Sequence, residues 1–196
     1  MKMCIALSIL VLASILIIPK IVWANETLDV IHSRKSVRSY TDQPVSKEDI
    51  EALLKAGMAA PSARDTRPWA FVVVTQKEKL SKLADSLPNG KMLKSAQAAI
   101  VVCGRFDKTL ANIAEGYWVQ DCSAASENIL LAAESIKLGA VWCGVYPNGE
   151  RVNAVRNILD IPDQVMPLNV ISIGYPTGAE RPKDKFDAAN IHWERW

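Results

Sequence analysis

The chain has 196 residues, enough for one domain that buries most of its apolar surface without disulfides or a structural metal. Apolar residues make up 49% of the chain and charged residues 22%, which excludes a disordered or collagen-like protein. The formal net charge of +2 and the presence of only two histidines argue against a nucleic-acid-binding protein and against a histidine-ligated zinc enzyme.

The N-terminal segment has the pattern of an export signal. Lys2 precedes a nearly uninterrupted apolar run over residues 4–18, and Ala24 closes an A-x-A-like cleavage site. We therefore predict a signal peptide over residues 1–24, an exported and periplasmic protein, and one folded domain over residues 25–196. An uncleaved membrane anchor is the alternative, although the run is shorter than the about 20 residues that a spanning helix needs. Beyond this segment we expect no association with a membrane.

Helices and strands alternate along the rest of the chain. Apolar residues at helical spacing predict helices over residues 27–34, 46–58, 77–87, 111–138 and 150–159. Continuous apolar runs, typical of strands covered on both faces, predict strands over residues 70–75, 98–104, 140–146 and 168–175. The intermixed order predicts a layered α+β or α/β domain, followed by an irregular or partly extended C-terminal arm.

Two basic clusters are candidates for binding an anion. Arg34 and Arg38 share a face if the chain is helical, and Ser36 joins them if the chain is extended. Two guanidinium groups and a hydroxyl suit a phosphate or another compact anion. Near the C-terminus, Lys183 and Lys185 share one face of an extended chain. Either cluster could equally be solvent-exposed charged surface, and the sequence does not show whether the two clusters meet.

Two segments beside predicted strands could line a ligand pocket. Prolines stiffen the loop over residues 60–69, in which Ser62 and Asp65 offer hydrogen-bond donors and acceptors. Gly144 follows Cys143 at the end of a strand, where the absence of a side chain would let a flat ligand approach the backbone. A plain helix-to-strand connection and a packing glycine are the alternatives. Cys143 has no histidine nearby in sequence to activate it as a nucleophile.

Taken in this order, the segments resemble the FMN-dependent nitroreductase family, from about Leu28 to the C-terminus. The family has an R-x-S-x-R/K element, an A-P-S-x-x-N-x-Q-P-W segment, a W-x-G or x-E-G turn, and a G-Y-P with a K-x-R/K pair. These motifs are matched here by Arg34, Ser36, Arg38, Ala60, Pro61, Ser62, Pro68, Trp69, Trp142, Gly144, Gly174, Tyr175, Pro176, Lys183 and Lys185. Two positions depart from the pattern, because the family's Asn is Asp65 and its Gln is Arg67. Asp65 lacks the amide donor of that Asn.

The resemblance implies an α+β three-layer sandwich, with a mainly antiparallel sheet between helices, assembled as an intertwined homodimer with FMN at the subunit interface. It implies that the flavin phosphate, ribityl chain and pyrimidine edge contact Arg34, Ser36, Arg38, Lys183 and Lys185. The ring would meet Pro61, Ser62 and Ala63 of the other subunit and, at its N5 edge, the main chain of Cys143 and Gly144. The predicted cofactor site also includes three residues next to these in the sequence, Lys35, Asp65 and Trp142.

The resemblance also implies that FMN takes a hydride from NADH or NADPH at N5 and passes electrons, in alternating half-reactions, to a small organic acceptor such as a nitroaromatic or a quinone. We expect no catalytic side chain and no metal. The alternatives are an exported flavin-binding module without pyridine-nucleotide turnover, a flavin enzyme that dehalogenates or fragments its substrate, and an α/β domain whose basic clusters are only surface. The sequence sets neither the natural acceptor nor the choice between NADH and NADPH.

Overall fold

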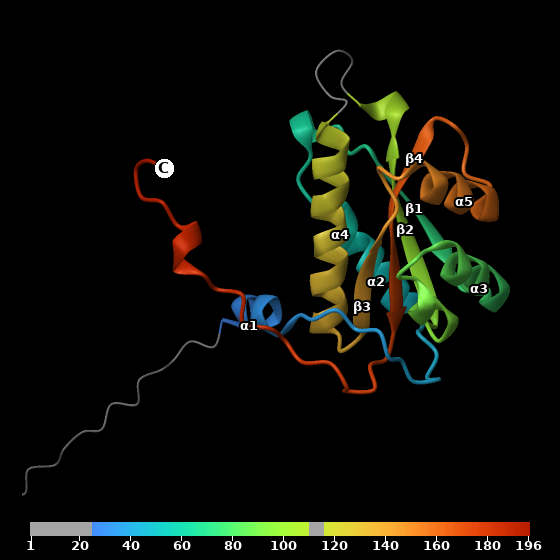
Figure 1. The fold of residues 1–196 in the computed structure, drawn as a ribbon, viewed down its shortest axis with the longest axis horizontal. Coiled ribbons are helices and arrows are strands. Elements are labelled where there is room, and N and C mark those ends of the chain that lie inside the picture. The colour runs from blue at the N-terminus through green and yellow to red at the C-terminus, as the bar shows by residue number, and fades with distance from the viewer. Residues whose placement is uncertain (1–24, 110–115) are drawn as a thin grey trace, which may run out of the picture.

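The computed structural model describes residues 25–109 and 116–196 (Figure 1). In this part of the chain a four-stranded sheet of order β1-β2-β4-β3 forms the centre, and every neighbouring pair is antiparallel. The strands are β1 (Trp69–Val74), β2 (Ala98–Arg105), β3 (Gly139–Gly144) and β4 (Val165–Gly174). The predicted signal peptide over residues 1–24 lies outside the described residues.

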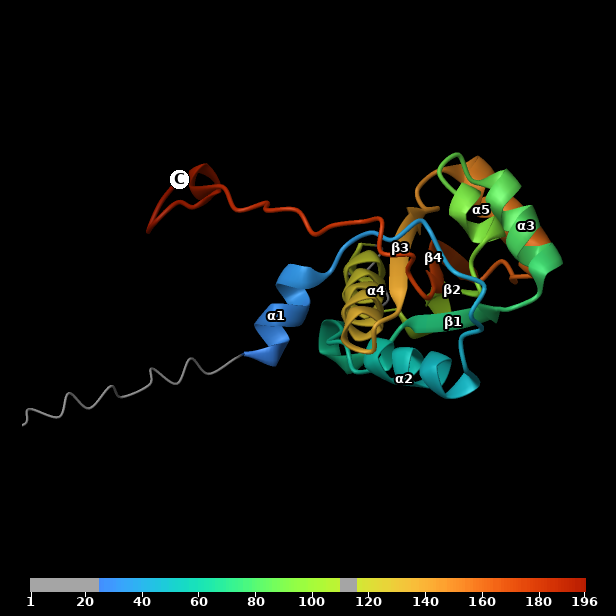
Figure 2. The ribbon, with the colours of Figure 1, turned by 90° about the horizontal axis from the view of Figure 1, so that it is seen from below.

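Helices cover both faces of the sheet. Helices α2 and α4 lie against one face, and α3 and α5 lie against the other, while α1 packs beside α4 at one end (Figure 2). The helices are α1 (Glu26–Ser33), α2 (Lys47–Met58), α3 (Lys77–Ser86), α4 (Tyr117–Ser135) and α5 (Gly149–Leu159). This arrangement confirms the predicted α+β sandwich. All of the predicted helices and strands are present, although the predicted start of the longest helix at Ala111 lies outside the described residues.

Local sequence explains where the elements begin and which side they bury. The Ser46 side chain caps α2 by accepting a hydrogen bond from the backbone N–H of Asp49 at 3.0 Å, as the capping-box pattern predicts. Strand β2 is buried along nearly its whole length because its alternate side chains serve two cores. Ile100 and Val102 face the α2 and α4 side, whereas Val101 faces the α3 and α5 side. The continuous apolar run is therefore a strand covered on both faces.

Two glycines at the end of the sheet let the segment after α1 lie directly on it. Gly139 and Gly174 are paired partners in β3 and β4. A Cβ at Gly139 would lie 2.6 Å from Val37 Cγ1, and a Cβ at Gly174 would lie 2.8 Å from Tyr40 Cδ1. Val37 and Tyr40 are both buried. The missing side chains thus make the space in which this segment is anchored.

Backbone hydrogen bonds then join this segment to the chain that leaves β4. The Thr41 N–H donates to the Tyr175 carbonyl at 2.9 Å, and the Thr177 N–H donates to the Ser39 carbonyl at 3.0 Å. On the other side, the Val37 N–H donates to a carbonyl of β3, that of Ala140, at 3.0 Å. Two stretches far apart in the sequence are consequently held side by side.

Beyond this ladder the chain extends away from the sheet as an arm that passes α1 and contains a 3-10 turn, Ala188–Asn190, before the C-terminus (Figures 1 and 2). Three of its large side chains are strongly exposed: Phe186 at 77%, Trp193 at 81% and Trp196 at 99%. The irregular C-terminal arm expected from the sequence is therefore present.

Among the helices within residues 25–109 and 116–196, none combines the length and the apolar character needed to cross a membrane.

We predict that Gly139→Ala lowers the free energy of unfolding by about 1–3 kcal/mol, because the new methyl group overlaps the rigid, buried Val37. Gly149→Ala is the matched control, since a Cβ at Gly149 meets no atom within 4 Å and the residue opens α5. Urea unfolding followed by circular dichroism checks both variants. Equal stabilities for the two variants would contradict the packing argument.

Candidate functional site

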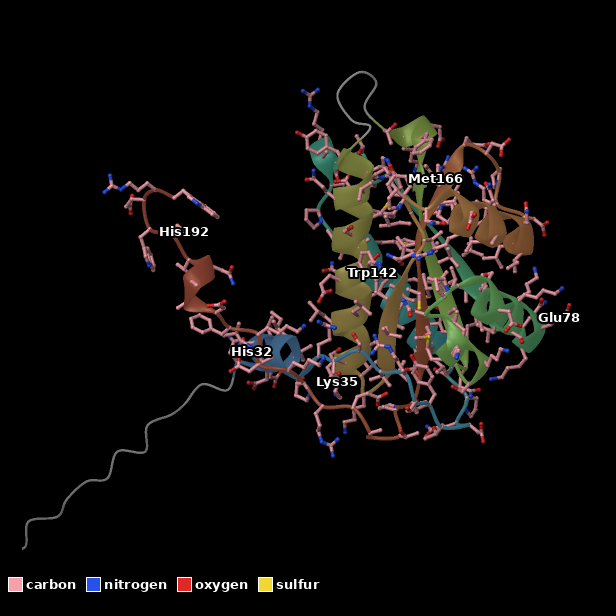
Figure 3. The ribbon with its side chains drawn as sticks, in the orientation of Figure 1. His32, Lys35, Glu78, Trp142, Met166 and His192 are labelled. Atoms are coloured by element: carbon pink, nitrogen blue, oxygen red, sulfur yellow. The ribbon has the colours of Figure 1, made fainter. Side chains whose placement is uncertain are left out.

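The early arginines and the late lysines line one cavity, of about 380 Å³. The ladder between the two chain segments brings these residues together, at the end of α4 where Figure 3 labels Lys35. The wall consists of Arg34, Lys35, Ser36, Arg38, Glu180, Arg181, Lys183 and Lys185. The two basic clusters that the sequence left separate therefore share a cleft. Glu180 is a wall residue that the sequence analysis did not select.

Helix α4 holds two of these cations through carboxylates of its own. Lys35 Nζ lies 2.9 and 3.1 Å from the two carboxylate oxygens of Glu134. Arg34 Nε lies 3.1 Å from Glu127 Oε1. Both side chains therefore contribute less unbalanced charge to the cavity than their number suggests. Lys35, which was predicted to contact the cofactor, is first of all an anchor on α4.

The remaining cations carry the charge that the cavity offers to an anion. Within residues 25–109 and 116–196, no carboxylate forms an ion pair with the side chain of Arg38, Lys183 or Lys185. Arg38 lies between two cavities, because it also lines a second one. The two cavities adjoin at this residue.

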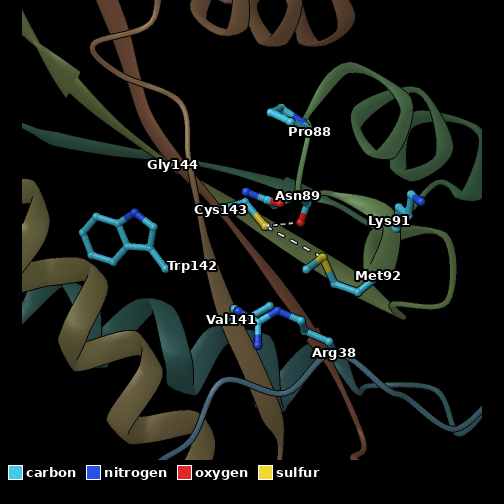
Figure 4. A pocket seen from close by; sticks show the side chains of 9 residues that line it. All are labelled: Arg38, Pro88, Asn89, Lys91, Met92, Val141, Trp142, Cys143 and Gly144. Carbon is cyan, nitrogen blue, oxygen red and sulfur yellow. Dashed lines mark hydrogen bonds between the residues drawn. The ribbon is translucent and has the colours of Figure 1, made fainter.

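The second cavity, of about 630 Å³, runs beside the end of β3 (Figure 4). Its wall includes Val141, Cys143 and Gly144 of β3 and Pro88, Asn89, Lys91 and Met92 from the turn after α3. A Cβ at Gly144 would meet no atom within 4 Å, and the residue is exposed. The backbone of β3 is thus open to a flat group that enters the cavity, as the sequence predicted for a glycine at this place.

Trp142, another predicted site residue, lies between Val141 and Cys143 in β3, and its indole points to the other face of the sheet. Successive side chains of a strand point to opposite faces of the sheet, so the Trp142 indole points away from the neighbouring Cys143 thiol (Figure 4). The indole packs with the apolar cluster on the α4 side. Trp142 nevertheless forms part of the wall of the second cavity, so it lines the cavity at β3 while its indole packs with the core.

The loop containing Pro61, Ser62, Ala63 and Asp65 does not line either of these cavities. Asp121, a buried acid near the start of α4, accepts a hydrogen bond from the Ala63 N–H at 2.9 Å. Glu134, which binds Lys35, lies near the other end of the same helix. At 1.5 Å per residue these two acids are about 20 Å apart, so the loop and the cationic cavity lie at opposite ends of α4 (Figure 1).

Asp121 is a functional candidate that sequence reasoning missed. It stands in a helix whose other buried residues are mostly apolar. A buried carboxylate needs a hydrogen-bond partner, and its position in an otherwise apolar face was the available signal. The Asp121 carboxylate accepts the hydrogen bond from the Ala63 N–H and so fixes the loop to α4.

The two departures from the family pattern, Asp65 and Arg67, pair with each other. Arg67 Nε lies 2.7 Å from Asp65 Oδ1. The hydrogen bond from Arg67 holds the pKa of Asp65 below its ordinary value. Both residues adopt positive φ, and the Arg67 N–H donates to Ser62 Oγ at 2.9 Å. The replacement charges are therefore satisfied locally and stiffen the loop.

The sequence left the pairing of Cys103, Cys122 and Cys143 open, and in the structure all three are free and buried. Burial raises the pKa of the Cys103 and Cys122 thiols to about 12. Burial likewise raises the pKa of Cys143 to about 11, although Arg38 opposes the effect. At neutral pH these groups are thiols rather than thiolates, and none is an activated nucleophile.

This thiol chemistry can be tested by labelling. In a Cys4→Ser variant of the full chain we expect no fast reaction with Ellman's reagent at pH 8, because the reagent attacks thiolates and burial suppresses them. Unfolding in guanidinium is the control and should release all three thiols. A thiol that labels in the native protein as fast as in the unfolded one would show that at least one cysteine is accessible.

The comparisons with known proteins bear on the whole domain. The Nitroreductase family model matches residues 31–90 and 85–175. A relative from Archaeoglobus fulgidus, named "Putative NADH dehydrogenase/NAD(P)H nitroreductase", is 47% identical over 175 residues, which are 88% of this chain and 99% of the relative. The chain belongs to the nitroreductase family. Its membership confirms the predicted resemblance and makes the protein an oxidoreductase.

Solved structures of nitroreductases have the same fold. A Parabacteroides distasonis protein of the same printed name as the Archaeoglobus relative has a TM-score of 0.83 and 52% identity, with 88% of this chain and 99% of that chain covered. An FMN-dependent nitroreductase from Clostridium difficile has a TM-score of 0.78 and 30% identity, with 86% and 99% covered. The cofactor classes predicted from the sequence, FMN and a reduced nicotinamide, agree with the names of these nitroreductases.

The predicted export to the periplasm is wrong. The relatives that match this chain are archaeal and bacterial nitroreductases, and the similarity to them gives export no support. The prediction rested on the apolar run over residues 4–18, outside the described residues. Many apolar segments that are not export signals share this hydrophobicity and small-residue motif. The pattern alone therefore did not determine the location of the protein.

Proposed function

We propose that the protein is an FMN-dependent oxidoreductase that moves electrons from NADH or NADPH to a small organic acceptor. The observation that carries the proposal is the pair of adjoining cavities. One is lined by cations from two distant parts of the chain, and the other runs along an open strand backbone. A ligand with an anionic tail and a flat head matches both.

The cationic cavity fits the phosphate end of FMN. A phosphate ester carries up to two negative charges, and the free ammonium groups of Lys183 and Lys185 would balance them. The Ser36 hydroxyl adds a neutral donor in the same wall. Because Arg34 and Lys35 are held by α4, they would keep the wall in place more than they would pair with the ligand.

The second cavity fits the ring end. The bare backbone at Gly144 would allow an isoalloxazine ring to approach the strand closely, and a side chain at that position would take up the same space. Arg38, at the junction of the cavities, would place a positive charge where reduced flavin becomes anionic. The protein would thus orient the cofactor and stabilise its reduced form without a nucleophilic side chain.

Bound FMN would supply the redox chemistry by accepting a hydride from the nicotinamide and passing electrons to the acceptor in a second half-reaction. Nitroaromatic and quinone-like compounds are the acceptor classes that we propose. The neutral Cys143 thiol beside the cavity would take no covalent part, because burial keeps it protonated.

We also infer that two copies of the chain complete the site. The loop held by Asp121 lies about 20 Å along α4 from the acid that holds Lys35, so within one chain it cannot reach the same end of a ligand. A second copy would bring its own loop, with Pro61, Ser62 and Ala63, to the ring. The exposed Trp193 and Trp196 of the arm support this inference, because a partner surface would cover them.

The test of the function is an absorption spectrum of the protein saturated with FMN, before and after anaerobic NADH or NADPH. We expect a flavin spectrum that bleaches, and for Arg38→Ala an FMN affinity at least about tenfold lower, because a charge-assisted contact is lost. Lys47→Ala is the control, since Lys47 is exposed on α2 and pairs only with Glu51 among the described residues.

Absence of any FMN binding would contradict the proposal. Flavin that binds but does not bleach with either nicotinamide would leave a flavin-binding module without turnover. Analysis of the acceptor's products would separate simple reduction from dehalogenation or fragmentation.

The homodimer has its own test. We expect light scattering of the full chain to give twice the mass of one chain, and a truncation that removes residues 188–196 to weaken the dimer, because the truncation deletes the exposed tryptophans of the arm. Dilution series on both proteins measure the effect. A full-length protein that is a monomer by light scattering and still binds FMN would contradict the two-copy site.

A further inference from the structure

The backbone of Gly144, in the wall of the second cavity, points to the outer edge of the sheet. Within the described residues β3 is the last strand in the sheet, next to β4. Successive residues of an antiparallel strand direct their N–H and carbonyl alternately toward the partner strand and away from it. The next residue, Val145, points toward β4, because its N–H donates to the Leu168 carbonyl at 3.0 Å. Gly144 therefore points outward, as does Ala140, whose carbonyl accepts from the Val37 N–H.

Arg151 holds the Gly144 carbonyl at this edge. Its guanidinium Nη1 donates to the carbonyl oxygen at 3.3 Å. Arg151 lies in the first turn of α5, where its own backbone N–H donates to Asn148 Oδ1 at 3.0 Å. The residue is thus fixed at both ends, with its backbone in the cap of the helix and its side chain on the strand.

The helix by itself does not explain a cation at this position. The N-terminus of an α-helix carries a partial positive charge, so its first turn favours an acid such as the neighbouring Glu150 and disfavours an arginine. Within residues 25–109 and 116–196, no carboxylate forms an ion pair with Arg151. The contact with Gly144 relates the charge to the second cavity instead (Figure 4).

The charge changes what the edge of β3 offers to a ligand. A carbonyl oxygen carries partial negative charge and would repel an electron-rich ring beside it. With Arg151 on this oxygen, the guanidinium offsets that charge, and the Gly144 N–H stays a donor. The charged residues that line the cavity in the described part of the chain, Arg38 and Lys91, are also cations. This end of the cavity consequently favours a flat ligand that gains negative charge.

We propose that Arg151 is a positioning residue that holds the Gly144 backbone at the ring of the bound flavin and raises the affinity of the site for reduced, anionic flavin relative to oxidised flavin. This inference rests on the proposed function, since it assumes that the FMN ring occupies the second cavity. Arg38 acts from the cavity wall itself, whereas Arg151 acts through the carbonyl that it binds.

The test is the ratio of the affinities of the protein for reduced and for oxidised FMN. The midpoint potential of bound FMN, relative to that of free FMN, gives this ratio, and equilibration of the FMN-saturated full chain with a redox dye of known potential measures it. We expect Arg151→Ala to lower the ratio by about three- to tenfold, since one partly exposed cation is lost. A tenfold fall corresponds to about 30 mV for a two-electron couple.

Two further substitutions separate the charge from the hydrogen bond. Arg151→Gln keeps an N–H donor for the Gly144 carbonyl and should show the lowered ratio. Arg151→Lys keeps the charge and should retain most of the wild-type ratio. Lys82→Gln is the matched control, because Lys82 is an exposed cation on α3 that pairs with Glu78, and its ratio should equal that of the wild type.

The stability of the variants shows whether Arg151 serves only the fold. We expect urea midpoints near that of the wild type, because the loss of the hydrogen bond is offset by the removal of a cation from the start of a helix. A lowered midpoint together with an unchanged affinity ratio would make the role of Arg151 structural and would overturn the inference.

The remaining outcomes are distinct. If Arg151→Ala and Arg151→Gln keep the wild-type ratio, the inference is wrong, while FMN that binds and bleaches leaves the proposed function standing. If Lys82→Gln lowers the ratio as much as Arg151→Gln does, the effect is one of net charge and the assignment to Arg151 is overturned. If the wild type binds no FMN, the proposed function and this inference fail together.

Discussion

The site depends on the short backbone ladder that joins residues 36–41 to residues 175–177. Without it, the arginines after α1 and the lysines of the C-terminal segment would belong to two unconnected surface strips. The ladder itself depends on Gly139 and Gly174, whose missing side chains let Val37 and Tyr40 settle against the end of the sheet. A packing constraint in the core thereby determines the electrostatics of a cleft at the surface.

The acids of the protein divide the cations into two groups with different tasks. Glu127 and Glu134 hold Arg34 and Lys35 against α4, where the charges mainly serve the structure. Among the described residues, no carboxylate forms an ion pair with the other four cations of the wall, which are Arg38, Arg181, Lys183 and Lys185. A count of basic residues would treat all six alike, and only the positions of the carboxylates distinguish them.

The fold was predictable to the extent that periodicity and turn chemistry determine it. The apolar strands and the capping box at Ser46 correspond to elements of the structure because both signals are local. The candidate cofactor residues were predicted from short motifs, and the structure brings the two basic clusters among them into one cavity. The face of the sheet that the Trp142 indole occupies could not be predicted, because a motif gives spacing but not the face of the sheet. Glu180 and Asp121 were missed because their importance comes from partners more than 50 residues away.

Distant partners also explain why the two basic clusters remained ambiguous in the sequence. Nothing local distinguishes Lys183 and Lys185 from an ordinary charged tail. They line the cavity because the chain after β4 runs beside the segment after α1, where Pro176 pairs with Tyr40. The N-terminal segment shows the opposite case, in which a strong local pattern led to an export prediction that the relatives contradict.

Helix α4 carries an acid that fixes the loop near one end and an acid that fixes Lys35 near the other. The helix therefore sets the distance between these two anchor points, which is about 20 Å. Deleting four residues would shorten it by about 6 Å and turn the rest of the helix by about 40°, which would move the two anchor points relative to each other. Insertions and deletions should consequently be tolerated far less in this helix than in the loops, even where they leave the apolar packing intact.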